Sequence, residues 1–167
     1  MERPISEVDE EEFLWQFCFV VLASYWKAQY AMKLLERFWD TKDLEIIHNA
    51  HKRNAIAQAI QKYPEWLRWI KYYAEKMDKP GDGYAYTLTY IDSLPMMGPV
   101  TKYHLARNLG LDCVKPDRHL VRLAERFGYP MPLAMCQDIQ REVGGSEKLG
   151  TIDLVLWWWC NLHGSET

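Results

Sequence analysis

The sequence predicts an all-α fold, and two observations carry this prediction. Apolar residues recur at steps of three and four along most of the 167 residues, which is the period of a helix buried on one face. No segment alternates apolar and polar residues over the length of a strand. Because 49% of the residues are hydrophobic, the chain can also bury a core. We expect a compact bundle of about eight to ten helices.

The first half of the chain predicts four or five helices. The apolar rhythm runs from residue 11 to 39 and is interrupted near Ser24, so we expect two helices there. Weaker repeats cover 43–50 and 53–63. Pro64 is placed to open another helix, because proline is favoured in a first helical turn. The segment 79–83, Lys-Pro-Gly-Asp-Gly, cannot continue a helix and predicts a loop.

The second half predicts shorter elements. A helix over 84–93, a tight turn over 94–99 and a helix over 100–109 would form a helix, a hairpin and a helix. Three further helices are expected at 116–127, 133–143 and 151–162. Glycines at 110, 128 and 144–145 are placed to end the helices before them, because glycine adopts the left-handed conformation at little cost.

Charge is unevenly distributed along the chain. The net charge of −3 argues against a general polyanion binder. Residues 1–12 contain six acids and one arginine, and we expect them to form an acidic, solvated tail. By contrast, six lysines and arginines but only three acids lie between 102 and 126, which predicts a local basic face.

The four cysteines, at 18, 113, 136 and 160, form no Cys-x-x-Cys pair and have apolar neighbours. This pattern predicts buried free thiols rather than a metal or iron–sulfur site, and no cofactor is expected. The sequence has no segment typical of a signal peptide and no apolar run of membrane-spanning length. We therefore expect an intracellular protein with no membrane partner.

Two segments are able to carry chemistry. The turn Leu94-Pro-Met-Met-Gly-Pro-Val-Thr101 precedes a helix, and free backbone N–H groups at such a point suit a phosphate. Sixteen residues after Thr101 comes Asp117-Arg-His-Leu-Val-Arg122. Taken alone, the turn is also typical of an ordinary helix connection, and Asp117 is also typical of a helix N-cap.

In this order and spacing, the two segments resemble those of the helix-hairpin-helix DNA glycosylases, the superfamily that includes endonuclease III. There, a hairpin Leu-Pro-Gly-hydrophobic-Gly is followed about twenty residues later by Asp-x-His, apolar residues and Arg. The resemblance extends more weakly to 20–24 and 158–164, and so covers most of the chain. It implies two helical lobes flanking a DNA-facing cleft within one unit over 13–167. One lobe would contain 13–40 with 130–167, and the other 41–129.

The resemblance also implies roles for individual residues. Asp117 would face the anomeric carbon of a flipped nucleotide, stabilise positive charge on the sugar, and orient or deprotonate water. Ser24, Tyr25 and Trp26 would lie at the base pocket or the vacated stack, although we expect core packing for Tyr25. The residues expected to contact DNA are Met96, Met97, Gly98, Val100, Thr101, Lys102, Arg118, His119 and Arg122.

Two departures from the family pattern carry information. Val100 stands where members that also cut the backbone have a nucleophilic lysine, which predicts no Schiff-base lyase activity. Lys102, two residues on, would point about 200° away around the helix. Met96 replaces the first hairpin glycine, so the backbone would approach DNA less closely there, or Met96 would itself contact the duplex.

The sequence therefore predicts a monofunctional DNA glycosylase that removes a damaged or modified base from double-stranded DNA and leaves an abasic site. A modified cytosine and a mismatched or deaminated base are among the options. We expect a cytoplasmic, nucleoid-associated monomer. A non-catalytic helix-hairpin-helix DNA-binding module and a helical interaction protein stay open as alternatives. For the consecutive tryptophans 157–159, which cannot form one stacking surface, we expect core and domain-joining roles.

Overall fold

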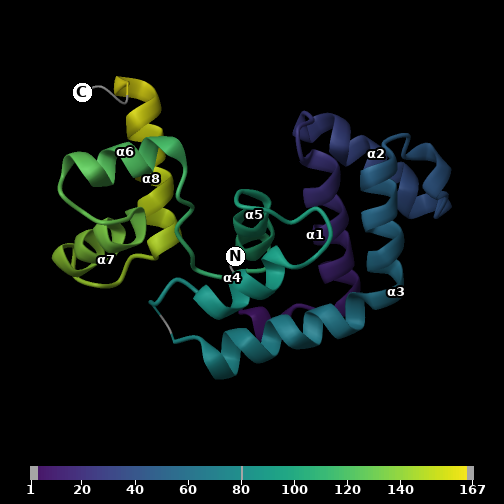
Figure 1. Ribbon diagram of the computed structural model, residues 1–167, viewed down its shortest axis with the longest axis horizontal. Helices are drawn as coiled ribbons and strands as arrows, with labels where there is room; N and C mark the ends of the chain where they lie inside the picture. Colours follow the sequence, from purple (N-terminus) through teal and green to yellow (C-terminus); the bar gives the residue numbers. More distant parts are fainter. Residues whose placement is uncertain (1–3, 80, 165–167) are drawn as a thin grey trace. The chain divides into compact units, whose positions relative to one another are not determined.

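The computed structural model describes residues 4–79 and 81–164, and Figure 1 shows its helices. This part of the chain contains eight α-helices and no strand, which confirms the all-α prediction. They are α1 (Glu10–Ala23), α2 (Ala28–Thr41), α3 (Ala50–Tyr72), α4 (Ala85–Asp92), α5 (Thr101–Asn108), α6 (Arg118–Arg126), α7 (Pro132–Glu142) and α8 (Leu149–His163). Two short 3₁₀ helices, η1 (Ile5–Glu7) and η2 (Leu44–Ile46), and one π-helical turn, η3 (Tyr73–Met77), complete the elements. None of the described helices is both long enough and apolar enough to span a bilayer.

The helices fall into two compact units. Among the described residues, the first unit contains 4–77 and 86–111, and the second contains 78–79, 81–85 and 112–164. The division places 13–40 and 130–164 in different units, whereas the sequence-based prediction grouped 13–40 with 130–167 in one lobe. Of the loop predicted at 79–83, Pro80 lies outside the described residues, and Lys79 and Gly81–Gly83 are non-helical as expected.

The core of the first unit is built on α1, which packs against α2, α3 and α5. Phe13, Phe17, Val20 and Val21 recur at helical spacing and are fully buried. The ring centroid of Phe17 lies 5.3 Å from that of Trp66 on α3. The buried face of α1 therefore holds the other helices of this unit in place.

The acidic N-terminal segment differs from the expected solvated tail. Residues 1–3 lie outside the described part, but Ile5 and Val8 are buried. Ser6 accepts a hydrogen bond at its carbonyl from the Lys71 ammonium, at 3.1 Å. Residues 10–12 form the first turn of α1, which Asp9 caps by accepting from the Glu12 amide at 2.8 Å. The apolar residues among the acids explain the difference, since their burial fixes the segment.

The prediction that Pro64 begins a helix is wrong, because Pro64 lies inside the continuous helix α3. Proline lacks the N–H that would bond the carbonyl four residues earlier, on Ile60. Both Pro64 and Ile60 lie on the exposed face of α3, so water can reach that carbonyl. The segment 43–50, expected to be helical, instead contains η2 and the start of α3, which Asn49 caps.

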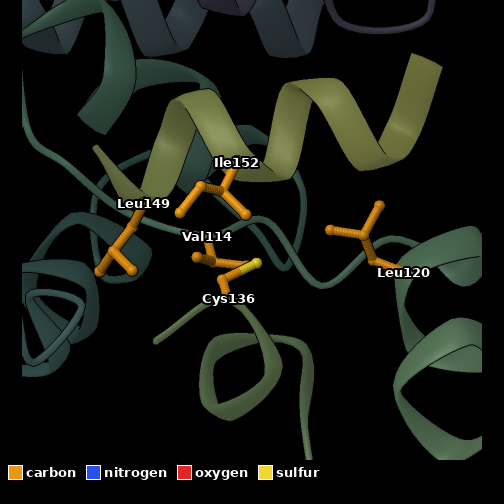
Figure 2. Packing of buried hydrophobic residues seen from close by; sticks show 5 residues of the cluster. All are labelled: Val114, Leu120, Cys136, Leu149 and Ile152. Carbon is orange, nitrogen blue, oxygen red and sulfur yellow. The ribbon is translucent and has the colours of Figure 1, made fainter. Parts of the chain in front are cut away.

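The second unit has its own apolar core, drawn in Figure 2. Side chains from α6, α7, α8 and the segment before α6 meet there: Val114, Leu120, Cys136, Leu149 and Ile152. Asp112 accepts hydrogen bonds from the amides of Leu149 and Gly150, at 3.1 and 2.8 Å, and the buried Asp153 accepts from the Lys115 amide at 2.6 Å. These bonds tie 112–115 to α8 and so fix the chain where it leads into α6.

The cysteines and tryptophans give contrasting results. All four cysteines are buried and none forms a disulfide, which confirms the prediction of buried thiols. Of the three consecutive tryptophans, Trp157 packs on the core of the second unit, but Trp158 and Trp159 are exposed. The core part of the prediction is therefore wrong for Trp158 and Trp159, because three consecutive positions span too wide an arc of α8 to share one buried face.

Candidate functional site

Asp117 lies at the N-terminus of α6 and caps it. Its Oδ1 accepts hydrogen bonds from the amides of His119 and Leu120, at 2.9 and 3.0 Å. Oδ2 makes no hydrogen bond within the described part of the chain. Leu120 is buried in the core of the second unit, so this end of the helix is firmly placed. One carboxylate oxygen is thus used for the fold, and the other is free for a ligand.

The charge of Asp117 affects another group within the second unit, the Cys160 thiol on α8. Burial raises the pKa of the Cys160 thiol, and the nearby Asp117 carboxylate raises it further. His119 adds an unusual feature, because its Nδ1 is buried and has no hydrogen-bond partner among the described residues. A buried polar atom without a partner is uncommon in folded proteins and is compatible with a bound water or ligand group. Arg118 and Arg122 are exposed on the same helix.

The turn between α4 and α5 is closed by Thr101, the first residue of α5. Its hydroxyl oxygen accepts from the Gly98 amide at 2.7 Å and donates to the Met96 carbonyl at 3.2 Å. The Met97 amide donates to the Leu94 carbonyl at 3.1 Å. Met96 has φ of 58°, the left-handed region that favours glycine. The backbone at Met96 is therefore of the kind that a glycine would adopt most easily.

Gly98 is not required by the internal packing of this turn. It is not among the residues with positive φ. A Cβ built on it would meet nothing closer than the Thr101 hydroxyl, at 3.9 Å. A methyl group would therefore fit within the chain itself, and close approach of an outside group would be a reason for glycine at this position.

The other residues expected to contact DNA around this turn have different surroundings. Met97 is buried, so only its backbone is available to a ligand, while Val100 is exposed. The Lys102 ammonium forms an ion pair with Asp92, at 3.4 Å. On the far end of α5, Asn108 donates to Gln16 of α1 at 3.0 Å, which fixes the helix on the first unit.

The turn between α1 and α2 contains two aromatic residues, one exposed to solvent and one packed against the first unit. Tyr25 is 101% exposed and has φ of 62°, so the core role predicted for it is wrong. Trp26 is half-buried, and its ring centroid lies 5.4 Å from that of Tyr30 in an edge-to-face arrangement. The Trp26 amide donates to the Ala23 carbonyl at 3.1 Å. Positive φ at a bulky residue directs the chain back so that Trp26, and not Tyr25, meets the body of the unit.

Sequence reasoning missed Lys52, which lies against this turn. Lys52 is 2% exposed, and its ammonium donates to the carbonyls of Leu22 and Ser24, at 2.8 and 2.6 Å. The same nitrogen lies 3.4 Å from the ring centroid of Trp26. A signal was present, because Lys52 shares the spacing of the buried residues Ala55, Ile56 and Ala59 on α3.

The predicted site residues form three groups. Met96–Lys102 make one turn and helix start, and Ser24–Trp26 make another turn; both belong to the first unit. Asp117, Arg118, His119 and Arg122 belong to the second unit. A pocket lined by Asp9, Glu11, Glu12, Trp15 and Trp39 shares no residue with these groups, and its three acids disfavour DNA phosphates there. Among the described residues, no group of His, Cys, Asp or Glu is arranged to hold a metal ion.

Comparison of the chain with models of protein families, with curated proteins and with solved structures finds no match.

Proposed function

We propose that this protein is a monofunctional DNA glycosylase that hydrolyses the N-glycosidic bond of a flipped, damaged or modified base. The observation that carries the proposal is the α4–α5 turn. Met96 has a glycine-like φ where the resembled hairpin has glycine, and Gly98 is a glycine that the chain's own packing does not require. Together with the downstream Asp117-x-His119 pattern, this favours a helix-hairpin-helix motif that approaches a DNA backbone closely.

In this proposal, Asp117 is the catalytic residue. Breaking the glycosidic bond creates positive charge on the sugar, and a fixed carboxylate stabilises that charge. The oxygen that accepts the two amides holds the side chain in place, while Oδ2 is left to face the sugar or to orient and deprotonate the attacking water. Abasic DNA and the free base are the products.

DNA is held by backbone groups and a few cations. The amides at the start of α5 and the exposed Arg118 and Arg122 would bind phosphates. Val100 has no nucleophilic atom at the position where related lyases carry lysine, so the reaction ends with hydrolysis. A further contact with the bases of the DNA would come from the Ser24–Trp26 turn. The substrate is double-stranded DNA, and the protein would act on it as a cytoplasmic monomer.

A second candidate function is a non-catalytic helix-hairpin-helix DNA-binding module. One observation favours it: within the described part of the chain, both hydrogen bonds of the Asp117 side chain come from backbone amides of its own helix, as in an ordinary N-cap. In that case the α4–α5 turn would bind DNA, and Asp117 would only stabilise α6.

The experiment that separates the two candidates is a base-release assay on a panel of duplexes that carry oxidised, alkylated, deaminated, mismatched or enzymatically modified bases. The protein is incubated with each duplex, and abasic sites are then cleaved with alkali. We expect strand breaks that require alkali for at least one substrate class. Salt-sensitive binding without release would support the binding module, and neither release nor binding would support an interaction protein without a DNA role.

A further inference from the structure

The turn between α1 and α2 contains a bulky residue in an unfavourable backbone conformation with no contact that would compensate for it. Tyr25 has φ of 62°, and such a conformation costs roughly 1–2 kcal/mol for a residue other than glycine. The Tyr25 side chain is 101% exposed, so it gains nothing from packing in return. Other residues must therefore hold the turn in this form.

Lys52 supplies that restraint. Its ammonium lies between the carbonyls of Leu22 and Ser24, near the end of α1, and the ring of Trp26. Carbonyls at a helix C-terminus carry partial negative charge and have no partner within the helix, so a cation there is favourable. The face of an indole ring also attracts an ammonium. The three contacts connect the residues on both sides of Tyr25 to a single atom on α3.

The surroundings of Lys52 argue against an ordinary ion pair. No carboxylate among the described residues pairs with its ammonium, and the residue as a whole is 2% exposed. Burial lowers the pKa of Lys52 to about 8, so the amine is still protonated at neutral pH. The Lys52 ammonium is balanced only by two carbonyls and one ring, and all three belong to this turn or to the end of α1 before it. Its contacts therefore stabilise mainly the turn.

We propose that Lys52 is a positioning residue that fixes the Ser24–Trp26 turn, and that Tyr25, rather than Trp26, is the aromatic side chain which this turn offers to a nucleobase. Trp26 is engaged by Lys52 and by the edge of Tyr30. Tyr25 is a flat aromatic group that needs no rearrangement before it contacts a base, and base–aromatic stacking tolerates any base. The nucleobase part of the inference rests on the proposed glycosylase function, whereas the positioning part rests on the contacts of Lys52 alone.

Local order of the turn is tested by amide hydrogen exchange on the whole protein at pH 7. Lys52→Met should make the amides of Ser24–Trp26 exchange at least about tenfold faster, while the amides of the buried core of α1 exchange as before. The matched control is Lys27→Met, which removes a neighbouring exposed lysine and should leave exchange unchanged. If Lys52→Met does not fold, Trp26→Leu removes the ring from the same ammonium and should also speed exchange at Tyr25. Unchanged exchange in the folded variants overturns the positioning role.

The role of Tyr25 is tested by affinity for a duplex that contains a stable abasic-site analogue. Tyr25→Ala and Lys52→Met should each raise Kd about tenfold, in line with the loss of one stacked base. Lys27→Met should raise it less than about threefold. If Trp26→Leu weakens binding and Tyr25→Ala does not, the assignment to Tyr25 is overturned. If the unmodified protein does not bind the duplex, the proposed function and the role of Tyr25 both fail, and the exchange experiment still decides the role of Lys52.

Discussion

At the scale of single residues, two side chains in unusual backbone conformations mark the turns that the proposed function uses. Tyr25 and Met96 are two of the four described residues other than glycine with positive φ. Each is held by polar groups nearby: the Lys52 ammonium at one turn, and the Thr101 hydroxyl at the other. Strained residues often occur at functional sites, where the surrounding structure fixes them. Neither conformation could be predicted from the sequence, because tyrosine and methionine have no preference for positive φ.

Lys52 gives a pH dependence whose sign can be worked out. Burial lowers its pKa from 10.5 to about 8 in the folded protein. Between these values the unfolded chain holds a proton that the folded chain has released, so the free energy of unfolding rises with pH across this window. The slope from this one group is at most about 1.4 kcal/mol per pH unit.

Urea unfolding of the unmodified protein and of Lys52→Met measures this effect. We expect the difference in free energy of unfolding to shift in favour of the unmodified protein as the pH rises from 8 to 10.5. Three tyrosines have raised pKa values and so lower the free energy of unfolding as the pH rises: Tyr84, Tyr90 and Tyr129. Both proteins contain them, so their effect cancels in the difference. A constant difference over the window would contradict the burial of the Lys52 charge.

At the scale of elements, most helices could be predicted from periodicity and glycine. The helices α5, α6 and α7 end within two residues of the expected positions, next to Gly110, Gly128 and Gly144, which all have positive φ. Pro64 misled the prediction, because a proline on an exposed helix face is tolerated when water reaches the freed carbonyl. Whether a proline opens a helix or lies within it depends on that exposure, which the local sequence does not reveal.

The α4–α5 turn allows a prediction with two contrasting glycines. Gly98→Ala should change the free energy of unfolding by less than about 0.5 kcal/mol, because neither φ nor packing opposes a methyl group. It should nevertheless weaken DNA binding, since the methyl would occupy the space where a phosphate approaches the backbone.

Gly128→Ala provides the opposite pattern. This glycine has φ of 78°, so alanine there should destabilise the protein by about 1 kcal/mol and leave DNA affinity unchanged. Thermal unfolding and fluorescence anisotropy on both variants measure the two effects. If Gly98→Ala binds DNA as tightly as the unmodified protein, the turn does not contact DNA in the proposed way.

At the scale of the whole molecule, the all-α class was predictable from periodicity, whereas the division into two units is seen only in the contacts between helices. The prediction that 13–40 and 130–167 form one lobe came from a family resemblance. The observed units follow from contacts such as those of α1 with α3. Short-range periodicity indicates which face of a helix is buried but not which helix covers it. For the same reason, the sequence indicated Asp117 and the turns separately and gave no information on Lys52 as a partner of the Ser24–Trp26 turn.

The net charge of −3 sets an expectation for how DNA binding depends on salt. A protein that relies mainly on backbone amides and a few cations should contact few phosphates through charged side chains. We expect log K to fall with log salt concentration at a slope between about −2 and −4, which corresponds to roughly two to four phosphates. A slope near zero in a titration from low to moderate salt would contradict phosphate binding and favour the interaction protein.

The central claim is that Asp117 performs chemistry beyond capping α6, and Asp117→Asn tests it most directly. Asparagine caps a helix as well as aspartate does, so the variant should unfold at the same temperature as the unmodified protein and bind DNA with the same Kd. It lacks the negative charge that the oxocarbenium-like transition state requires. We therefore expect base release from the best substrate of the panel to fall at least about 100-fold. Release at the rate of the unmodified protein would contradict the account.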